Sequence, residues 1–250
     1  MEEILLFLSM VLILTLGIIY CNKRNLVMAK NIIKTVLTFF LFFYSGIFSK
    51  ALLLILNKKY TDSIDVYLNT FSNVCLALIL LLMYKKELIK EFKKFKNNFS
   101  ENIDIGFKYW TLGIIVMMVS NILINFFITN TQATNEQAVQ NMISQLPILM
   151  ILNAGLIGPL IEEITFRKSL RKVFSNEWLF IIISSLLFGS LHVIPGIIRG
   201  SSLIELFYII PYSALGFSFA YMYHKTDTVF TSYTMHALHN TILVILSMLK

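Results

Sequence analysis

Apolar runs of about the length that crosses a lipid bilayer recur along the whole chain. A transmembrane helix needs about 20 predominantly apolar residues. With 57% hydrophobic and 14% charged residues, the composition is far from the roughly 45–50% and about 25% typical of soluble domains. We predict an all-α polytopic membrane protein, a single membrane domain over residues 1–250 with about eight transmembrane helices, at 4–21, 35–56, 66–84, 109–128, 146–166, 178–194, 203–223 and 228–249.

The two halves of this domain have different polar content. Residues 1–130 hold N-terminal helices, and residues 146–245 hold the helices that carry polar motifs. The first run, Ile4–Cys21, follows two glutamates and has no small-residue cleavage site, so we predict a retained helix rather than a signal peptide.

Basic residues alternate between the segments that separate the runs. Sixteen of the 21 Lys and Arg residues lie in four segments, at 22–34, 85–108, 167–177 and 224–227. Cytoplasmic loops carry an excess of Lys and Arg, so we predict that these four segments are cytoplasmic and that both termini lie outside. The net charge of +7 therefore reflects topology, and we predict no nucleic-acid partner.

The basic segment 85–99, KKELIKEFKKFKNNF, has apolar residues at helical spacing. It fits either a helix on an anionic membrane surface or a solvated, topology-setting helix end. The cysteines, Cys21 and Cys75, are too few for a disulfide framework. A cysteine nucleophile is disfavoured because all four histidines are distant in the sequence.

Ionisable side chains gather in three of the C-terminal runs. Such residues are costly within a membrane and mark functional sites by default. The first run ends in EEITFR, the second in FGSLH and the third contains HALHN, which together supply Glu162, Glu163, Arg167, Phe188, His192, His236, His239 and Asn240.

The two glutamates have different surroundings. Adjacent helix positions point about 100° apart, so Glu162 and Glu163 face different neighbours. Glu163 and Arg167 are four residues apart and can form an ion pair along one face. Glu162 is left as the acid suited to general-base catalysis. Pro159, one turn earlier, is expected to bend or open this helix.

The two later runs place further polar groups at helical spacing. Phe188 and His192 share a face, and Gly189 between them permits close approach of a neighbouring helix. His236 and Asn240 are also four residues apart, and two such donors converging on one point can stabilise an oxyanion. His239 is expected only to contact a neighbouring helix.

The motifs EEITFR, FGSLH and HALHN resemble EExxxR, FxxxH and HxxxN of the CAAX-protease and bacteriocin-processing (CPBP, or Abi) family of intramembrane endopeptidases. The resemblance covers about residues 146–245. It implies that Glu162 activates water with the help of His192, and that His236 and Asn240 stabilise the oxyanion. The matching Glu163, Arg167 and Phe188 would have supporting roles. Many members have glycine after the arginine, where this chain has Lys168.

We predict no cofactor, because the resemblance fits a metal-free, glutamate-activated water at least as well as a metal site. Zinc is possible, because Glu162, His192 and His236 are the residue types that bind it with an open position for water, although the chain has no HExxH pair. The expected partners are a peptide or protein substrate and membrane lipids. Localisation is predicted as a multi-pass integral protein of a bacterial cell membrane.

We therefore predict an intramembrane endopeptidase that cleaves a peptide or protein tail at the cytoplasmic side, such as a pheromone or bacteriocin precursor. A bacteriocin self-immunity protein using the same site is an alternative. A proton-coupled transporter would also use buried acids and histidines, but the sequence has no evident internal repeat. A non-catalytic membrane scaffold is the remaining alternative.

Overall fold

The computed structural model describes residues 26–61 and 64–249, and within these ranges it contains helices and no strands. The N-terminal part comprises α2 (Leu26–Phe43), α3 (Gly46–Ile55), α4 (Asp65–Asn97) and α5 (Phe99–Phe127). After the short α6 (Thr134–Gln145), a composite helix runs through α7 (Pro147–Met150), η2 (Ile151–Ile157), α8 (Gly158–Glu162) and η3 (Glu163–Ser169). The last elements are α9 (Glu177–Ile198), η4 (Leu203–Tyr208), α10 (Ile209–Thr226) and α11 (Val229–Met248).

Within the described residues, five helices are long and apolar enough to cross a membrane, or six if the bent pair α2 and α3 forms one span. This confirms the prediction of an all-α polytopic membrane protein. The predicted count of eight is not confirmed. The first predicted run, 4–21, lies outside the described residues. The bend of 55° between α2 and α3 divides the predicted run 35–56.

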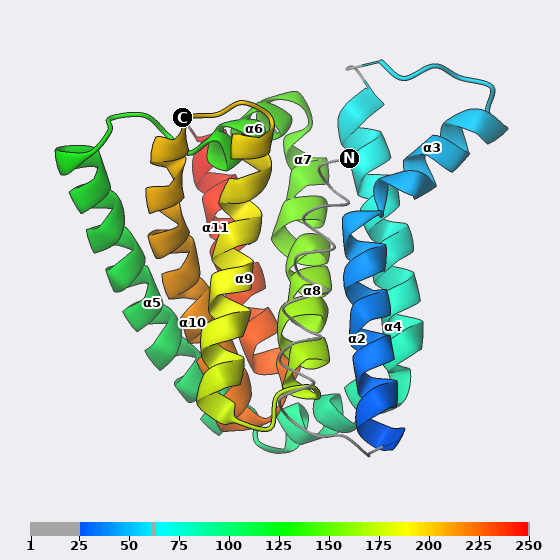
Figure 1. Ribbon diagram of the computed structural model, residues 1–250, viewed down its shortest axis with the longest axis vertical. Helices are drawn as coiled ribbons and strands as arrows, with labels where there is room; N and C mark the ends of the chain where they lie inside the picture. Colours follow the sequence, from blue (N-terminus) through cyan, green and yellow to red (C-terminus); the bar gives the residue numbers. More distant parts are fainter. Residues whose placement is uncertain (1–25, 62–63, 250) are drawn as a thin grey trace.

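Helix α11 coincides with the predicted run 228–249 but is not among the candidate spans. Its length is sufficient at 20 residues, so its composition excludes it. His236, His239 and Asn240 lower the hydropathy of the middle of the helix. Helix α11 nevertheless packs against η2 and α10 within the bundle (Figure 1), and His236 and His239 are buried there.

The basic segments lie together at one end of the bundle. In Figure 1, the start of α2, the junction of α4 and α5, the turn before α9 and the turn between α10 and α11 are all at the bottom. Ion pairs connect them: Lys34 and Lys172 both contact Glu87, at 2.9 and 2.5 Å. This arrangement agrees with the alternation of basic segments in the sequence.

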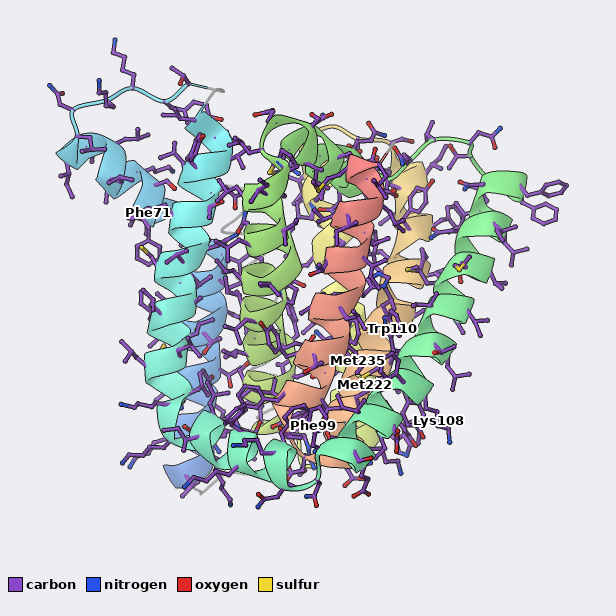
Figure 2. The ribbon with its side chains drawn as sticks, turned by 180° about the vertical axis from the view of Figure 1, so that it is seen from behind. Phe71, Phe99, Lys108, Trp110, Met222 and Met235 are labelled. Carbon is purple, nitrogen blue, oxygen red and sulfur yellow. The ribbon has the colours of Figure 1, made fainter. Side chains whose placement is uncertain are left out.

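Helix α5 covers the C-terminal helices through a cluster of large side chains. Figure 2 labels Trp110 of α5 beside Met222 of α10 and Met235 of α11. Met222 and Met235 are fully buried. Gly106 of α5 allows this contact, because a Cβ atom there would lie 3.0 Å from the Met235 side chain. The cluster packs behind the helix face that carries His236.

Candidate active site

The glutamates lie on a helix that is irregular on both sides of them. The segments η2 and η3 have the wider π-helical turn, and the single α-helical turn of α8 lies between them. Pro159 is in the first turn of α8, where its missing N–H is least costly. The bend or opening expected from Pro159 thus takes the form of two π-helical segments, a feature that often occurs at functional sites.

The irregular segment η2 is fixed to α11. Asn240 donates a hydrogen bond of 3.1 Å from Nδ2 to the Ala154 carbonyl. The neighbouring Gly155 permits this approach, because a Cβ atom there would lie 2.7 Å from the Thr241 hydroxyl oxygen. One amide hydrogen of Asn240 is therefore used in helix packing, and the second remains for another acceptor.

Glu163 and Arg167 form an ion pair in the interior, as their spacing predicts. The side chains have no solvent exposure, and Arg167 Nη1 lies 3.2 Å from Glu163 Oε1. Arg167 also donates from Nη2 to the Gly216 carbonyl at 3.1 Å. Its guanidinium lies 4.5 Å from the centre of the Phe188 ring. The pair therefore joins η3 to α9 and α10.

His236 lies between the two glutamates. Its Nδ1 is 3.0 Å from Glu163 Oε1, and its Nε2 is 3.6 Å from Glu162 Oε2. The imidazole is stacked on Phe219, with a ring separation of 4.5 Å, and lies edge-on to Phe188. Because a carboxylate can only accept, Nδ1–H of His236 donates to Glu163. Its Nε2 is thereby directed towards Glu162.

His192 is held by backbone and by an aromatic ring. Its Nδ1 lies 2.8 Å from the Phe188 carbonyl, and a carbonyl only accepts, so Nδ1 carries the hydrogen. The ring stacks on Tyr212 at 4.7 Å. In the neutral tautomer this leaves Nε2 as an acceptor. The Phe188 ring lies between the two histidines, 4.6 Å from the His192 ring and 5.6 Å from the His236 ring.

His239 points to a different part of the bundle. It is buried, and its ring is edge-on to Trp110 at 6.4 Å. This agrees with the expectation that it contacts a neighbouring helix, here α5. The side chains that the structure brings together are therefore those of Glu162, Glu163, Arg167, Phe188, His192 and His236, with Asn240 one turn further along α11.

Three neighbours of this site were not predicted from the sequence. Phe219 supports His236, Tyr212 supports His192 and the Gly216 carbonyl accepts from Arg167. All three belong to α10, which has no charged residue before its last turn. Aromatic and glycine residues are common in membrane helices, so the sequence contained no signal that set these three apart.

Solvent exposure distinguishes Glu162 from its partners. Its side chain is 22% exposed, whereas those of His236 and Glu163 are 3% and 0% exposed. Within the described residues, Glu162 Oε2 and Glu163 Oε2 are buried oxygens without a hydrogen-bond donor. Glu162 is thus the more accessible of the two carboxylates.

The described residues do not form a metal site. No three of their His, Cys, Asp and Glu side chains are grouped so that they could hold a metal ion. The grouping that the three-ligand zinc site considered from the sequence would need is thus not found among these residues.

Comparison with known proteins identifies the C-terminal part. Residues 144–242 match the family described as type II CAAX prenyl endopeptidase Rce1-like. The chain is 26% identical over 182 residues to "Putative membrane peptidase YdiL" of Bacillus subtilis, which covers 70% of this chain and 68% of that protein. It is 29% identical over 170 residues to UPF0177 protein YxdF of Lactococcus lactis, which covers 65% of this chain and 85% of that protein. No solved structure matches significantly.

The matched segment contains all three motifs, and the protein is a multi-pass membrane protein with bacterial relatives. The resemblance carried by the motifs is thereby confirmed: residues 144–242 match the Rce1-like family, in agreement with the CAAX-protease and bacteriocin-processing motifs of this segment.

Proposed function

We propose that this protein is an intramembrane endopeptidase in which Glu162 activates a water molecule. The observation that carries the proposal is the connected series Glu162, His236, Glu163 and Arg167, whose successive contacts are 3.6, 3.0 and 3.2 Å. Its three inner members are buried, and Glu162 is partly exposed. Such a series orients one accessible carboxylate inside a membrane protein, as a hydrolase requires.

In the proposed reaction, water attacks the carbonyl carbon of a peptide bond while Glu162 accepts a proton from the water. His192 Nε2 accepts a hydrogen bond from the same water and so orients it. The tetrahedral intermediate collapses with cleavage of the C–N bond. Glu162 then returns its proton to the leaving amine. The products are a carboxylic acid and an amine, between which the second proton of the water then passes to give a carboxylate and an ammonium group, and Glu162 is again ionised.

The oxyanion of the intermediate needs hydrogen-bond donors. We assign this role to His236 Nε2 and to the second amide hydrogen of Asn240. A His236 protonated on both nitrogens donates Nδ1–H to Glu163 and presents Nε2–H to the oxyanion. Its positive charge and that of Arg167 together balance the two glutamates. Glu163, Arg167 and Phe188 therefore act by holding His236 in position.

The substrate is proposed to be a peptide or protein tail presented at the basic end of the bundle. Lys and Arg segments mark the cytoplasmic side, and Glu162 lies only seven residues before the end of η3 at that side. This distance corresponds to about 10 Å of helix. A secreted peptide precursor, such as that of a pheromone or bacteriocin, fits this location.

The proposal is tested by comparing secreted and membrane peptides from cells that express wild type or Glu162→Gln at matched levels. Glutamine keeps the size of the side chain and removes its basicity. Glu101→Gln, at an exposed position on α5, is the control. We expect a peptide that is produced by wild type and by Glu101→Gln and is absent with Glu162→Gln. The same peptide yield from all three proteins would refute the role of Glu162.

A further inference from the structure

A buried glutamate lies within the most basic segment of the chain. Glu91 of α4 is 7% exposed, although it belongs to the segment 85–99, for which the sequence indicated a membrane-surface or solvated helix. Its Oε1 accepts from Lys168 Nζ and, at 3.3 Å, from the Tyr223 hydroxyl. Its Oε2 accepts from the backbone N–H of Val229 at 2.9 Å. Its carbonyl accepts from the Thr228 hydroxyl.

These contacts connect Glu91 to three elements that build the candidate site. Lys168 belongs to η3, directly after Arg167; Tyr223 belongs to α10; and Val229 is the first residue of α11. Glu91 itself lies outside residues 144–242, the part that matches the family. One side chain of the N-terminal half thus binds the same end of three C-terminal helices.

The contact with Val229 stabilises the start of α11. The first N–H groups of a helix have no partner within the helix, and a negative charge is favourable there. Glu91 supplies both an acceptor and the charge, and Thr228 accepts from the next N–H, that of Phe230. The first turn is also closed by a hydrogen bond of 3.1 Å from the Ser232 hydroxyl to the Val229 carbonyl.

We propose that Glu91 is a positioning residue of the peptidase site: by holding Val229 and Lys168 together, it fixes α11 against η3 and so places His236 beside the glutamates. His236 follows Val229 by seven residues, which is two helical turns or about 10 Å. A shift at the first turn is transmitted along this short helical segment. The catalytic consequence rests on the proposed function, whereas the structural consequence does not.

Lys168 explains why a glutamate is needed at this place. The side chain of this lysine is only 7% exposed. A buried charge without a partner is strongly unfavourable, and Glu91 provides the partner. A buried ion pair can nevertheless often be replaced by apolar side chains without loss of stability. This allows the charge balance and the contact with α11 to be tested separately.

The test compares two double variants that both lack the ion pair. Glu91→Gln/Lys168→Met retains a carbonyl oxygen that can accept from the Val229 N–H. Glu91→Leu/Lys168→Met has the same charge and a similar volume but no acceptor. The control is Lys94→Met, which removes the exposed pair between Lys94 and Asp227 (44% and 76% exposed) one turn further along α4. Exposed pairs of this kind contribute little to stability.

Hydrogen exchange is measured on the detergent-solubilised proteins, and peptide yield is measured in cells that express them. Hydrogen exchange, followed by mass spectrometry of peptides covering residues 226–236, reports the order of the first turns of α11. The yield of the wild-type-dependent peptide per folded protein reports activity. In the leucine variant we expect the protection of these amides from exchange and the peptide yield each to fall about tenfold, which is the effect of one charge-assisted hydrogen bond. The glutamine variant and the control should remain within about threefold of wild type.

Equal exchange in the two double variants would refute the positioning role, as would an unchanged peptide yield from the leucine variant. If no wild-type-dependent peptide exists, the proposed function fails, and the exchange measurement alone then decides whether Glu91 orders α11. A loss of thermal stability that is equal in both double variants, with equal peptide yield, would assign Glu91 a structural role only.

Discussion

Replacing Arg167 by methionine should be the most destabilising charge change in the candidate site. Methionine preserves most of the side-chain volume, so the main effect is electrostatic. Glu163 would be left without its guanidinium partner at a position with no solvent exposure. The hydrogen bond to Gly216 and the contact with the Phe188 ring would also be lost.

The expected size of the effect follows from the burial of both groups. Removing one partner of a buried ion pair costs about 3–5 kcal/mol, which is a large part of a typical folding free energy of about 5–15 kcal/mol. For a chain of this length, 1 kcal/mol corresponds to a shift in Tm of roughly 2–4 °C. Arg167→Met should therefore lower the Tm by about 6–20 °C, and the folded yield with it.

The assay is thermal unfolding of detergent-solubilised protein, with Glu163→Gln/Arg167→Met as the matched variant. This double variant contains no unpaired buried charge and should recover more than half of the lost Tm. Its peptide yield should stay low, because His236 no longer faces a carboxylate at Nδ1. A single variant that melts within about 2 °C of wild type, or a double variant no more stable than the single one, would contradict this reasoning.

Three further outcomes are expected. Gly189→Ala should destabilise the packing of α9 on α10 by about 1–3 kcal/mol, because its Cβ would meet Ser213 Oγ and, at 2.8 Å, the Ile209 carbonyl. The control is Gly46→Ala, whose Cβ would have nothing within 4 Å. Equal Tm values for the two variants would contradict the steric argument. His239→Ala should retain most of the peptide yield while His236→Ala loses it, and an equal loss would show that the wrong histidine was assigned. Treatment of the purified protein with a chelator should leave cleavage unchanged; a loss that zinc restores would reveal a metal requirement.

The membrane architecture was predictable because hydropathy and charge are local properties of the sequence. From α2 onwards, each predicted run falls on helical segments, although α4 and α5 extend well beyond theirs, and the basic segments lie at one end. The pair of Glu163 and Arg167 was predictable for the same reason, since both residues belong to one helix. The number of spans was not, because polar site residues lower the hydropathy of α11 and a bend divides the run 35–56.

Contacts between helices could not be predicted from the sequence. Helical spacing places His236 on one face of α11, but it does not specify that Glu163, 73 residues earlier, lies opposite. Nor does it specify that Asn240 bonds to the backbone of η2. A signal for Glu91 was present: it shares the buried stripe of α4 with Tyr84, Leu88 and Phe95. Because Glu91 is charged and lies among lysines, its place in this buried stripe was not recognised from the sequence.

The position of His236 on the last of the described helices has a consequence for biosynthesis. The glutamates emerge from the ribosome more than 70 residues before this histidine, and α11 must insert after η3, α9 and α10 are already made. During translation, a partly synthesised chain therefore contains the acid without its imidazole partner. Under the proposed function, hydrolytic activity begins only when α11 has inserted, so nascent chains are unable to cleave neighbouring proteins at the site of membrane insertion.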